Sequence, residues 1–112
     1  MTTIGTQVTL NGPFVLDRGT ISLMVARNPG VYVLTRDGKR ANYVGRSDGD
    51  VQGRLAQHIG SGYSHFWFAY ASSPMDAFLK ECWLWHQYSP TDNSIHPDRP
   101  NGSGWRCPVC GN

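Results

Sequence analysis

The sequence predicts a small single domain of the α/β (α+β) class with three strands and two helices. Its 112 residues and 39% hydrophobic content suffice for one hydrophobic core. Short runs of β-branched and aromatic residues indicate strands, and Asp37-Gly38 between two such runs is a hairpin signal. Two longer segments repeat apolar residues at helical spacing, which predicts helices.

The first 29 residues predict an irregular lead-in, because Gly12-Pro13, Gly19 and Pro29 interrupt any periodic pattern. We expect at most one short strand there, around Phe14 to Leu16. The polar start lacks the basic and apolar regions of a signal peptide, and no apolar run is long enough to span a membrane. The expected location is therefore the cytoplasm.

The best-defined strand is Val31 to Leu34, which lies between Pro29-Gly30 and Asp37-Gly38. A returning strand over Ala41 to Gly45 would complete a hairpin. If Asp37-Gly38 is a two-residue turn, Tyr32 pairs directly with Tyr43 on one face of the sheet.

Asp50 to Ile59 predicts a helix with Ser47, Asp48 or Asp50 as its N-cap and Gly60 at its end. Val51, Leu55 and Ile59 form its apolar stripe. Arg54 and His58 share the same four-residue spacing at the edge of that stripe. The aromatic segment His65 to Tyr70 predicts a third strand.

A second helix is expected from Pro74 to about Tyr88. Glu81, the only Glu in the chain, falls between apolar residues of this helix and away from its narrow polar stripe. A buried carboxylate requires a cation, a metal ion or hydrogen-bond donors. Glu81 is therefore a candidate functional residue.

The tail after Ser89 has no periodicity, which suggests that some interaction ties it down. Cys82 and His86 have i, i+4 helical spacing, and Cys107 and Cys110 have the spacing of a zinc knuckle. These four residues predict a structural zinc site without an open position, in which His96 could replace His86. The alternatives are a redox Cys pair, or a buried Cys82 and hydrogen-bonded His86 beside a fraying tail.

Two phenols (Tyr32 and Tyr43), a guanidinium and an imidazole (Arg54 and His58) and the Glu81 carboxylate together suit phosphodiester hydrolysis. A divalent metal ion on the carboxylate would polarise the phosphate, and the guanidinium would offset negative charge. A Tyr or His could orient or deprotonate water. Taken singly, each of these residues is more often structural.

Gly30-Val31-Tyr32, followed after ten residues by Tyr43-Val44-Gly45, resembles the two-part signature of the GIY-YIG endonuclease superfamily. Arg54 to His58 is similar to the family's helix with its Arg and, in some members, its His. Glu81 resembles the family's metal-binding Glu, and Asn93 resembles its late Asn. The resemblance covers residues 30–93, the expected catalytic core, and 94–112 would be a zinc-bound extension.

The resemblance implies a small three-stranded, mostly antiparallel sheet flanked by helices, and a metal-dependent nuclease active on DNA. Tyr32 would activate water, with Tyr43 and His58 assisting. Arg54 would bind phosphate, and Glu81 would be the single protein ligand of Mg²⁺ or Mn²⁺. Asn93 would hold substrate or brace the site. Double-strand cleavage would need two sites, for example in a homodimer.

Four basic residues near the hairpin predict a rim that contacts the DNA backbone: Arg36, Lys39, Arg40 and Arg46. A solvated turn is an equally good interpretation of them. Two other functions compete with the nuclease. One is a zinc-containing binding module on the same fold that has lost cleavage. The other is a protein-interaction domain with Trp67, Trp83, Trp85 and Trp105 as surface anchors, although core positions are favoured for these residues.

Overall fold

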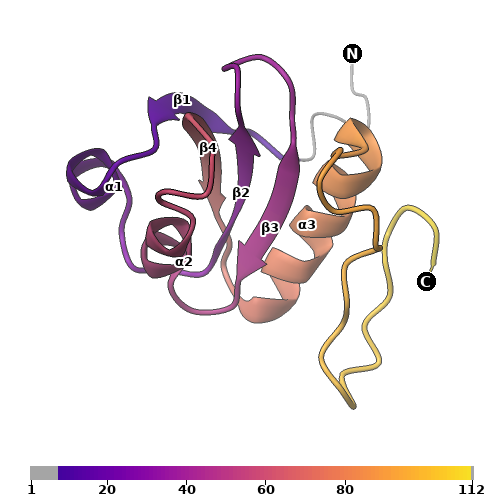
Figure 1. Ribbon diagram of the computed structural model, residues 1–112. Coiled ribbons are helices and arrows are strands. Elements are labelled where there is room, and N and C mark those ends of the chain that lie inside the picture. The colour runs from indigo at the N-terminus through magenta and orange to yellow at the C-terminus, as the bar shows by residue number, and fades with distance from the viewer. Residues whose placement is uncertain (1–7, 112) are drawn as a thin grey trace.

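The computed structural model of the protein describes residues 8–111 as a small α+β domain (Figure 1). In chain order the elements are β1 (Asn11–Val15), α1 (Arg18–Met24), β2 (Gly30–Thr35), β3 (Tyr43–Ser47), α2 (Val51–Gln57), β4 (His65–Tyr70) and α3 (Pro74–Tyr88). The strands form one antiparallel sheet in the order β1-β4-β2-β3. Helices α1 and α2 lie on one face of the sheet and α3 lies on the other. The predicted class is confirmed, but the sheet has four strands instead of three.

The expected irregular lead-in is wrong in that it contains the helix α1, whereas the one short strand expected around Phe14 to Leu16 is present as β1 at Asn11–Val15. The Asp17 side chain caps α1 by accepting a hydrogen bond from the Thr20 backbone N–H at 2.7 Å. Only Ile21 of this seven-residue helix is buried. A helix with a single core residue leaves no apolar repeat to detect. The strand β1 pairs with β4, and the register of this pairing shifts between Asn11 and Phe14.

The predicted pairing of Tyr32 with Tyr43 is also wrong. Tyr32 pairs with Gly45, and Tyr43 pairs with Leu34. The connection is longer than two residues because the Asp37 carboxylate accepts hydrogen bonds from the backbone N–H groups of Lys39 and Arg40, at 2.8 and 2.9 Å. The two tyrosines still stack diagonally across the strands, with ring centroids 6.2 Å apart.

The other predicted elements are present, with bounds close to those expected. Asp50 caps α2 through the Gly53 N–H at 2.9 Å, and Ser73 caps α3 through the Asp76 N–H at 3.1 Å. Gly60 has a φ of +86°, the left-handed conformation expected after α2. No helix or strand follows Tyr88 in the described part of the tail.

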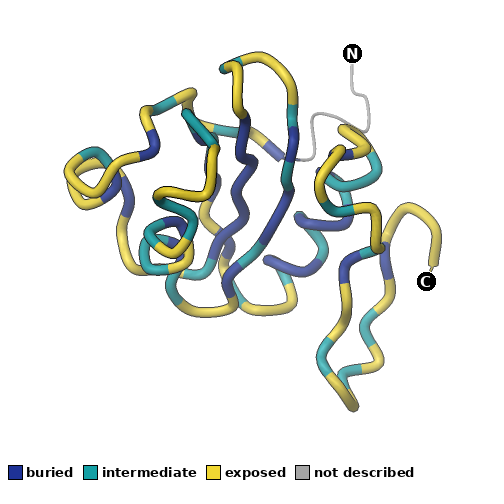
Figure 2. Tube along the Cα trace, in the orientation of Figure 1, coloured by how far each residue is buried: buried dark blue, intermediate teal, exposed yellow. Residues whose placement is uncertain are grey.

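Two apolar clusters lie on the two faces of the sheet, and Figure 2 shows that β2, at the centre of the molecule, is buried along its length. One packs α1 and α2 against residues such as Leu34 and Phe66. The other packs α3 against residues such as Val33 and Val44. The four tryptophans are partly buried and pack on the second cluster or, for Trp105, on a smaller one beside α3.

The helices in residues 8–111 are too short or too polar to cross a lipid bilayer.

Candidate active site and metal centre

A cleft of about 280 Å³ lies where side chains from both faces of the sheet meet at its β3 edge. It is lined by Tyr32, Tyr43, Arg46, Asp48, Arg54, Glu81 and Asp98. Four of the six predicted catalytic residues are in this lining, and a fifth, His58, is hydrogen-bonded to one of them. Residues from two strands, two helices and the tail therefore converge on one concave surface.

Tyr32 enters the cleft from a buried position in β2, with 1% of its surface exposed. Its hydroxyl lies over Gly45, where a Cβ atom would come within 2.5 Å of the Tyr32 oxygen. Only glycine leaves room for the phenol at this position. Burial, and then the neighbouring Tyr43, raise the pKa of the Tyr32 phenol well above its ordinary value of 10. Tyr32 is consequently a neutral hydroxyl at physiological pH.

The Tyr32 hydroxyl is 2.9 Å from His58 Nε2. His58 is the C-cap residue of α2, so the end of this helix positions the imidazole against the phenol. Burial, and then the Arg54 charge, lower the pKa of His58 below 6.5. The imidazole is therefore neutral at pH 7 and can accept the Tyr32 proton.

Arg54 lies beside this pair on the same helix and is exposed. Within residues 8–111, no hydrogen bond or ion pair engages its guanidinium group. An exposed cation in the cleft is available to an anionic ligand.

Glu81 is buried on α3, and Arg46 of β3 provides the positive charge and the hydrogen-bond donor that its carboxylate needs. Arg46 Nη1 donates to Glu81 Oε1 at 2.6 Å, and Arg46 Nε donates to Asp48 Oδ1 at 3.0 Å. The guanidinium also lies over the Phe78 ring, 5.3 Å from its centroid. Burial raises the pKa of the Glu81 carboxyl, and the hydrogen bond from Arg46 partly opposes that rise.

Three carboxylates line this cleft, and Glu81 is the one placed to act as a single protein ligand of a divalent cation. Arg46 engages one oxygen of Glu81, and Asp48 and Asp98 line the same surface. Mg²⁺ and Mn²⁺ prefer carboxylate oxygens and retain water ligands, which an open cleft allows. Glu81 could therefore hold such an ion.

Asn93 does not line the cleft. Its side chain accepts a hydrogen bond from the Val44 N–H at 3.2 Å and donates one to the Val44 carbonyl at 2.6 Å. Of the two roles considered for Asn93, holding substrate or bracing the site, these contacts correspond to bracing.

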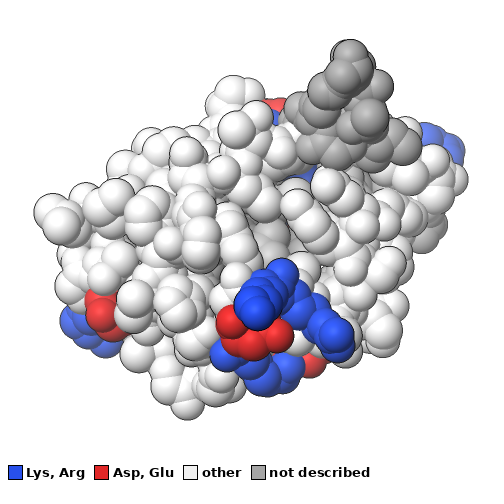
Figure 3. Space-filling model, turned by 90° about the horizontal axis from the view of Figure 1, so that it is seen from above, with Lys and Arg blue, Asp and Glu red and all other residues white. Residues whose placement is uncertain are grey.

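The four basic residues of the predicted rim are not equivalent. Lys39 and Arg40 are exposed at the hairpin tip. Arg36 forms an ion pair with Asp92 and lies over the Tyr63 ring. Arg46 forms an ion pair with Glu81. Figure 3 views the molecule from above the orientation of Figure 1 and shows basic and acidic side chains interleaved in one group on that face.

A second cluster contains His86, His96, Cys107 and Cys110, whose candidate ligand atoms all lie within 4.8 Å of one another. Such a cluster can hold a metal ion such as zinc. It contains three of the four predicted zinc ligands, with His96 in place of Cys82. Both histidines belong to it, although the sequence offered them as alternatives.

Cys82 is fully buried with Cys107 in a small apolar cluster. Burial raises the pKa of the Cys82 thiol. Burial alone would also raise that of Cys107, but hydrogen bonds, first from the backbone N–H groups of Cys110 and Val109, bring its pKa to about 6.

Sequence reasoning missed the Arg46 partnership with Glu81 and the presence of Asp48 and Asp98 in the cleft. Arg46 lies two residues after the buried Val44, so the alternation of the strand could have placed it on the α3 face. Asp98 gave no signal, because it lies in a tail without periodicity. No protein-family model and no curated protein matches the chain.

Proposed function

We propose that the protein is a DNA endonuclease that hydrolyses phosphodiester bonds with the help of one Mg²⁺ or Mn²⁺ ion. The observation that carries this proposal is the cleft at the edge of β3, where the Tyr32–His58 pair, the Arg54 cation and the Glu81 carboxylate face one space. These are the groups that phosphodiester hydrolysis requires: a proton acceptor, a phosphate ligand and a cation site.

Tyr32 and His58 form the proton relay of this proposal. The attacking water transfers a proton to the Tyr32 oxygen while Tyr32 passes its own proton to His58 Nε2. The raised pKa of Tyr32 favours this relay over a standing phenolate. The relay requires neutral His58, so cleavage should decline as pH falls through the lowered pKa of that residue.

Arg54 binds the phosphate that is attacked, and Tyr43 stacks on Tyr32 to hold the phenol in place. Glu81 would hold the divalent cation, and the bound ion would supply Lewis-acid polarisation of the phosphate and stabilisation of the leaving oxygen. Arg46 keeps Glu81 paired and oriented. The second ion of the proposal is zinc, in a structural role, because Cys and His are its usual ligands.

The deciding experiment is cleavage of supercoiled plasmid by wild type and by Glu81→Gln, each with Mg²⁺, Mn²⁺ or EDTA. Gln keeps the shape of the side chain and an oxygen for Arg46 but removes the negative charge. Wild type should cut only with a divalent cation, and Glu81→Gln should lose on the order of 100-fold or more in rate. Zinc content and circular dichroism check that both proteins are folded.

A binding module that has lost cleavage is the second candidate, favoured by the Arg46 ion pair that already occupies Glu81. If neither protein cuts any DNA while both bind it, this candidate replaces the nuclease. Plasmid nicking without linearisation would indicate single sites acting separately, whereas direct linearisation would favour a homodimer.

A further inference from the structure

The His/Cys cluster joins segments that are far apart in the chain. His86 belongs to α3, His96 lies near the start of the tail, and Cys107 and Cys110 lie near its end. Figure 1 shows the tail running beside α3 as one long loop. Within residues 8–111 this is the only group of three or more His, Cys, Asp or Glu side chains close enough to share an ion.

His86 provides an independent indication of a ligand. Its Nε2 atom is buried and has no hydrogen-bond partner. Buried polar atoms without partners are rare and destabilising in folded proteins. A metal ion held with the other three side chains would satisfy this atom.

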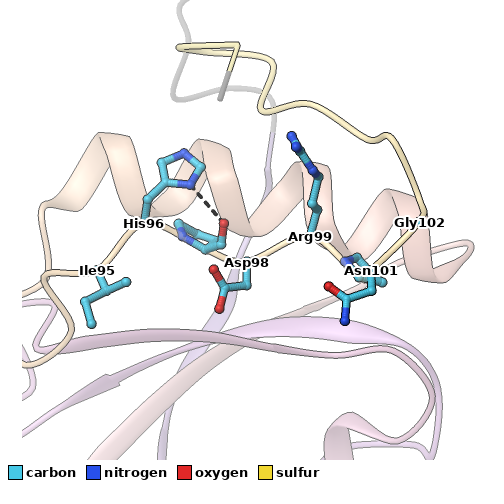
Figure 4. Close-up of a pocket in the computed structure, with 8 residues that line it drawn as sticks. Ile95, His96, Asp98, Arg99, Asn101 and Gly102 are labelled. Atoms are coloured by element: carbon cyan, nitrogen blue, oxygen red, sulfur yellow. Dashed lines mark hydrogen bonds between the residues drawn. The ribbon is translucent and has the colours of Figure 1, made fainter.

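His96 has the tautomer that metal binding requires. Its Nδ1 lies 2.9 Å from the Pro97 carbonyl, which can only accept, so Nδ1 carries the proton (Figure 4). The free lone pair is then on Nε2, which lies 3.4 Å from Cys110 Sγ. Tetrahedral zinc with ordinary Zn–N and Zn–S bonds separates two such ligands by roughly 3.6 Å.

Asp98 connects this cluster to the cleft. It follows the ligand His96 by two residues, and it lines both the cleft and an adjoining hollow of about 510 Å³ formed by residues 95–102. Figure 4 shows the Asp98 and Asn101 side chains on one side of this segment and those of His96 and Arg99 on the other. The segment has no regular structure of its own, so its position depends on its anchor.

We propose that His86, His96, Cys107 and Cys110 bind one zinc ion, that Cys82 is an unliganded neighbour, and that the ion holds segment 95–102 in place as a wall of the cleft. Four protein ligands leave no position for substrate, so the ion is structural. The ligand set stands without the proposed nuclease function. The consequence for DNA binding rests on that function.

The ligand set is tested by loading the full chain with Co²⁺ under reducing conditions and recording its absorption spectrum. We expect tetrahedral d–d bands and thiolate charge-transfer absorption equal to two thiolates. Cys82→Ser should leave that intensity unchanged, whereas Cys110→Ser should halve it. A loss in Cys82→Ser would overturn the ligand set, and so would a wild-type protein that binds no zinc.

The positioning role is tested by hydrogen exchange with and without chelation of zinc. Peptides covering 95–102 should exchange at least 10-fold faster without zinc, while β2 and β4 stay protected. Equal exchange in both states would overturn this role. In parallel, DNA affinity of Glu81→Gln should fall about 10-fold on chelation. If that protein binds no DNA in either state, the proposed function fails while the exchange and Co²⁺ results still decide the zinc proposal.

Discussion

At the scale of single residues, the absence of a Cβ atom at Gly45 gives the Tyr32 side chain access to the cleft. The Tyr32 oxygen and a Cβ atom at position 45 would be 2.5 Å apart, well inside van der Waals contact. The pairing of Tyr32 with Gly45 across β2 and β3 creates this requirement. Tyr32 and Gly45 therefore act as a pair in space, because the glycine of one strand leaves room for the tyrosine of the other.

Gly45→Ala should displace the Tyr32 hydroxyl and break its contact with His58. We expect cleavage to fall at least 10-fold, with a loss of about 1–3 kcal/mol in the free energy of unfolding because the position is overpacked. Initial cleavage rates and urea denaturation measure the two effects. Gly49→Ala is the matched control, because nothing lies within 4 Å of its added Cβ. Full activity in Gly45→Ala would contradict the assigned role of Tyr32.

The sequence could predict single residues only where local spacing determines their neighbours. Arg54 and His58 followed from helical spacing, and the need of Glu81 for a partner followed from its apolar surroundings. The partner itself, Arg46, is 35 positions away. Its approach depends on how β3 packs against α3, which no local pattern encodes.

At the scale of elements, the basic residues of the hairpin differ in whether an acidic side chain already pairs with them. The Asp37 carboxylate orders the backbone of Lys39 and Arg40 and leaves both side chains exposed. The ion pair of Arg36 with Asp92 joins the hairpin to the tail. The predicted rim should therefore act mainly through Lys39 and Arg40.

Replacing Lys39 and Arg40 with Ala should weaken DNA binding and reduce the slope of log K against log [salt] by about 2, since each phosphate contact contributes roughly 0.9. Adding Arg36→Ala should change the slope by less than 1, because Asp92 already neutralises that charge. Binding titrations from low to high salt provide the slopes. Arg18→Ala, on the remote helix α1, serves as the control. An unchanged slope in the double variant would exclude the rim.

Elements with caps and several core residues could be predicted, and elements without them could not. The helix α3 has Ser73, Pro74 and five buried residues to mark it, whereas α1 has one buried residue. The sequence predicts a short strand around Phe14 to Leu16 but neither the bounds of β1 nor its pairing with β4, because the register shifts and the alternation is interrupted. Such elements are stabilised by tertiary packing instead of by their own pattern.

At the scale of the whole molecule, ionisation should make the fold less stable in acid. The backbone N–H groups of Arg40 and Lys39 lower the pKa of Asp37 to about 2, and the Gly53 N–H lowers that of Asp50. The unfolded chain binds protons at these carboxylates from about pH 3.8 downward, before the folded chain does, so stability is lost as pH falls. His58 acts in the same direction below pH 6.5, because its folded pKa is lowered. Glu81 has the opposite sign, since its folded pKa is raised.

We expect the urea midpoint to fall below pH 6.5 through His58, and again between pH 4 and pH 2 through the aspartates. His58→Gln should flatten the first decline, and Asp37→Asn should flatten part of the second. Denaturation curves at fixed ionic strength provide the midpoints. A midpoint that rises on acidification would mean that Glu81 dominates the pH dependence.

The edge of the sheet at β3 is closed by the chain segment that follows α3. Asp92 N–H donates to the Asn42 carbonyl, and the Asn93 side chain pairs with both backbone groups of Val44. An amide side chain thus takes the place of a neighbouring strand. Sheet edges with unpaired backbone groups recruit strands from other molecules and promote aggregation. Asn93 therefore blocks the addition of a strand from another molecule at Val44.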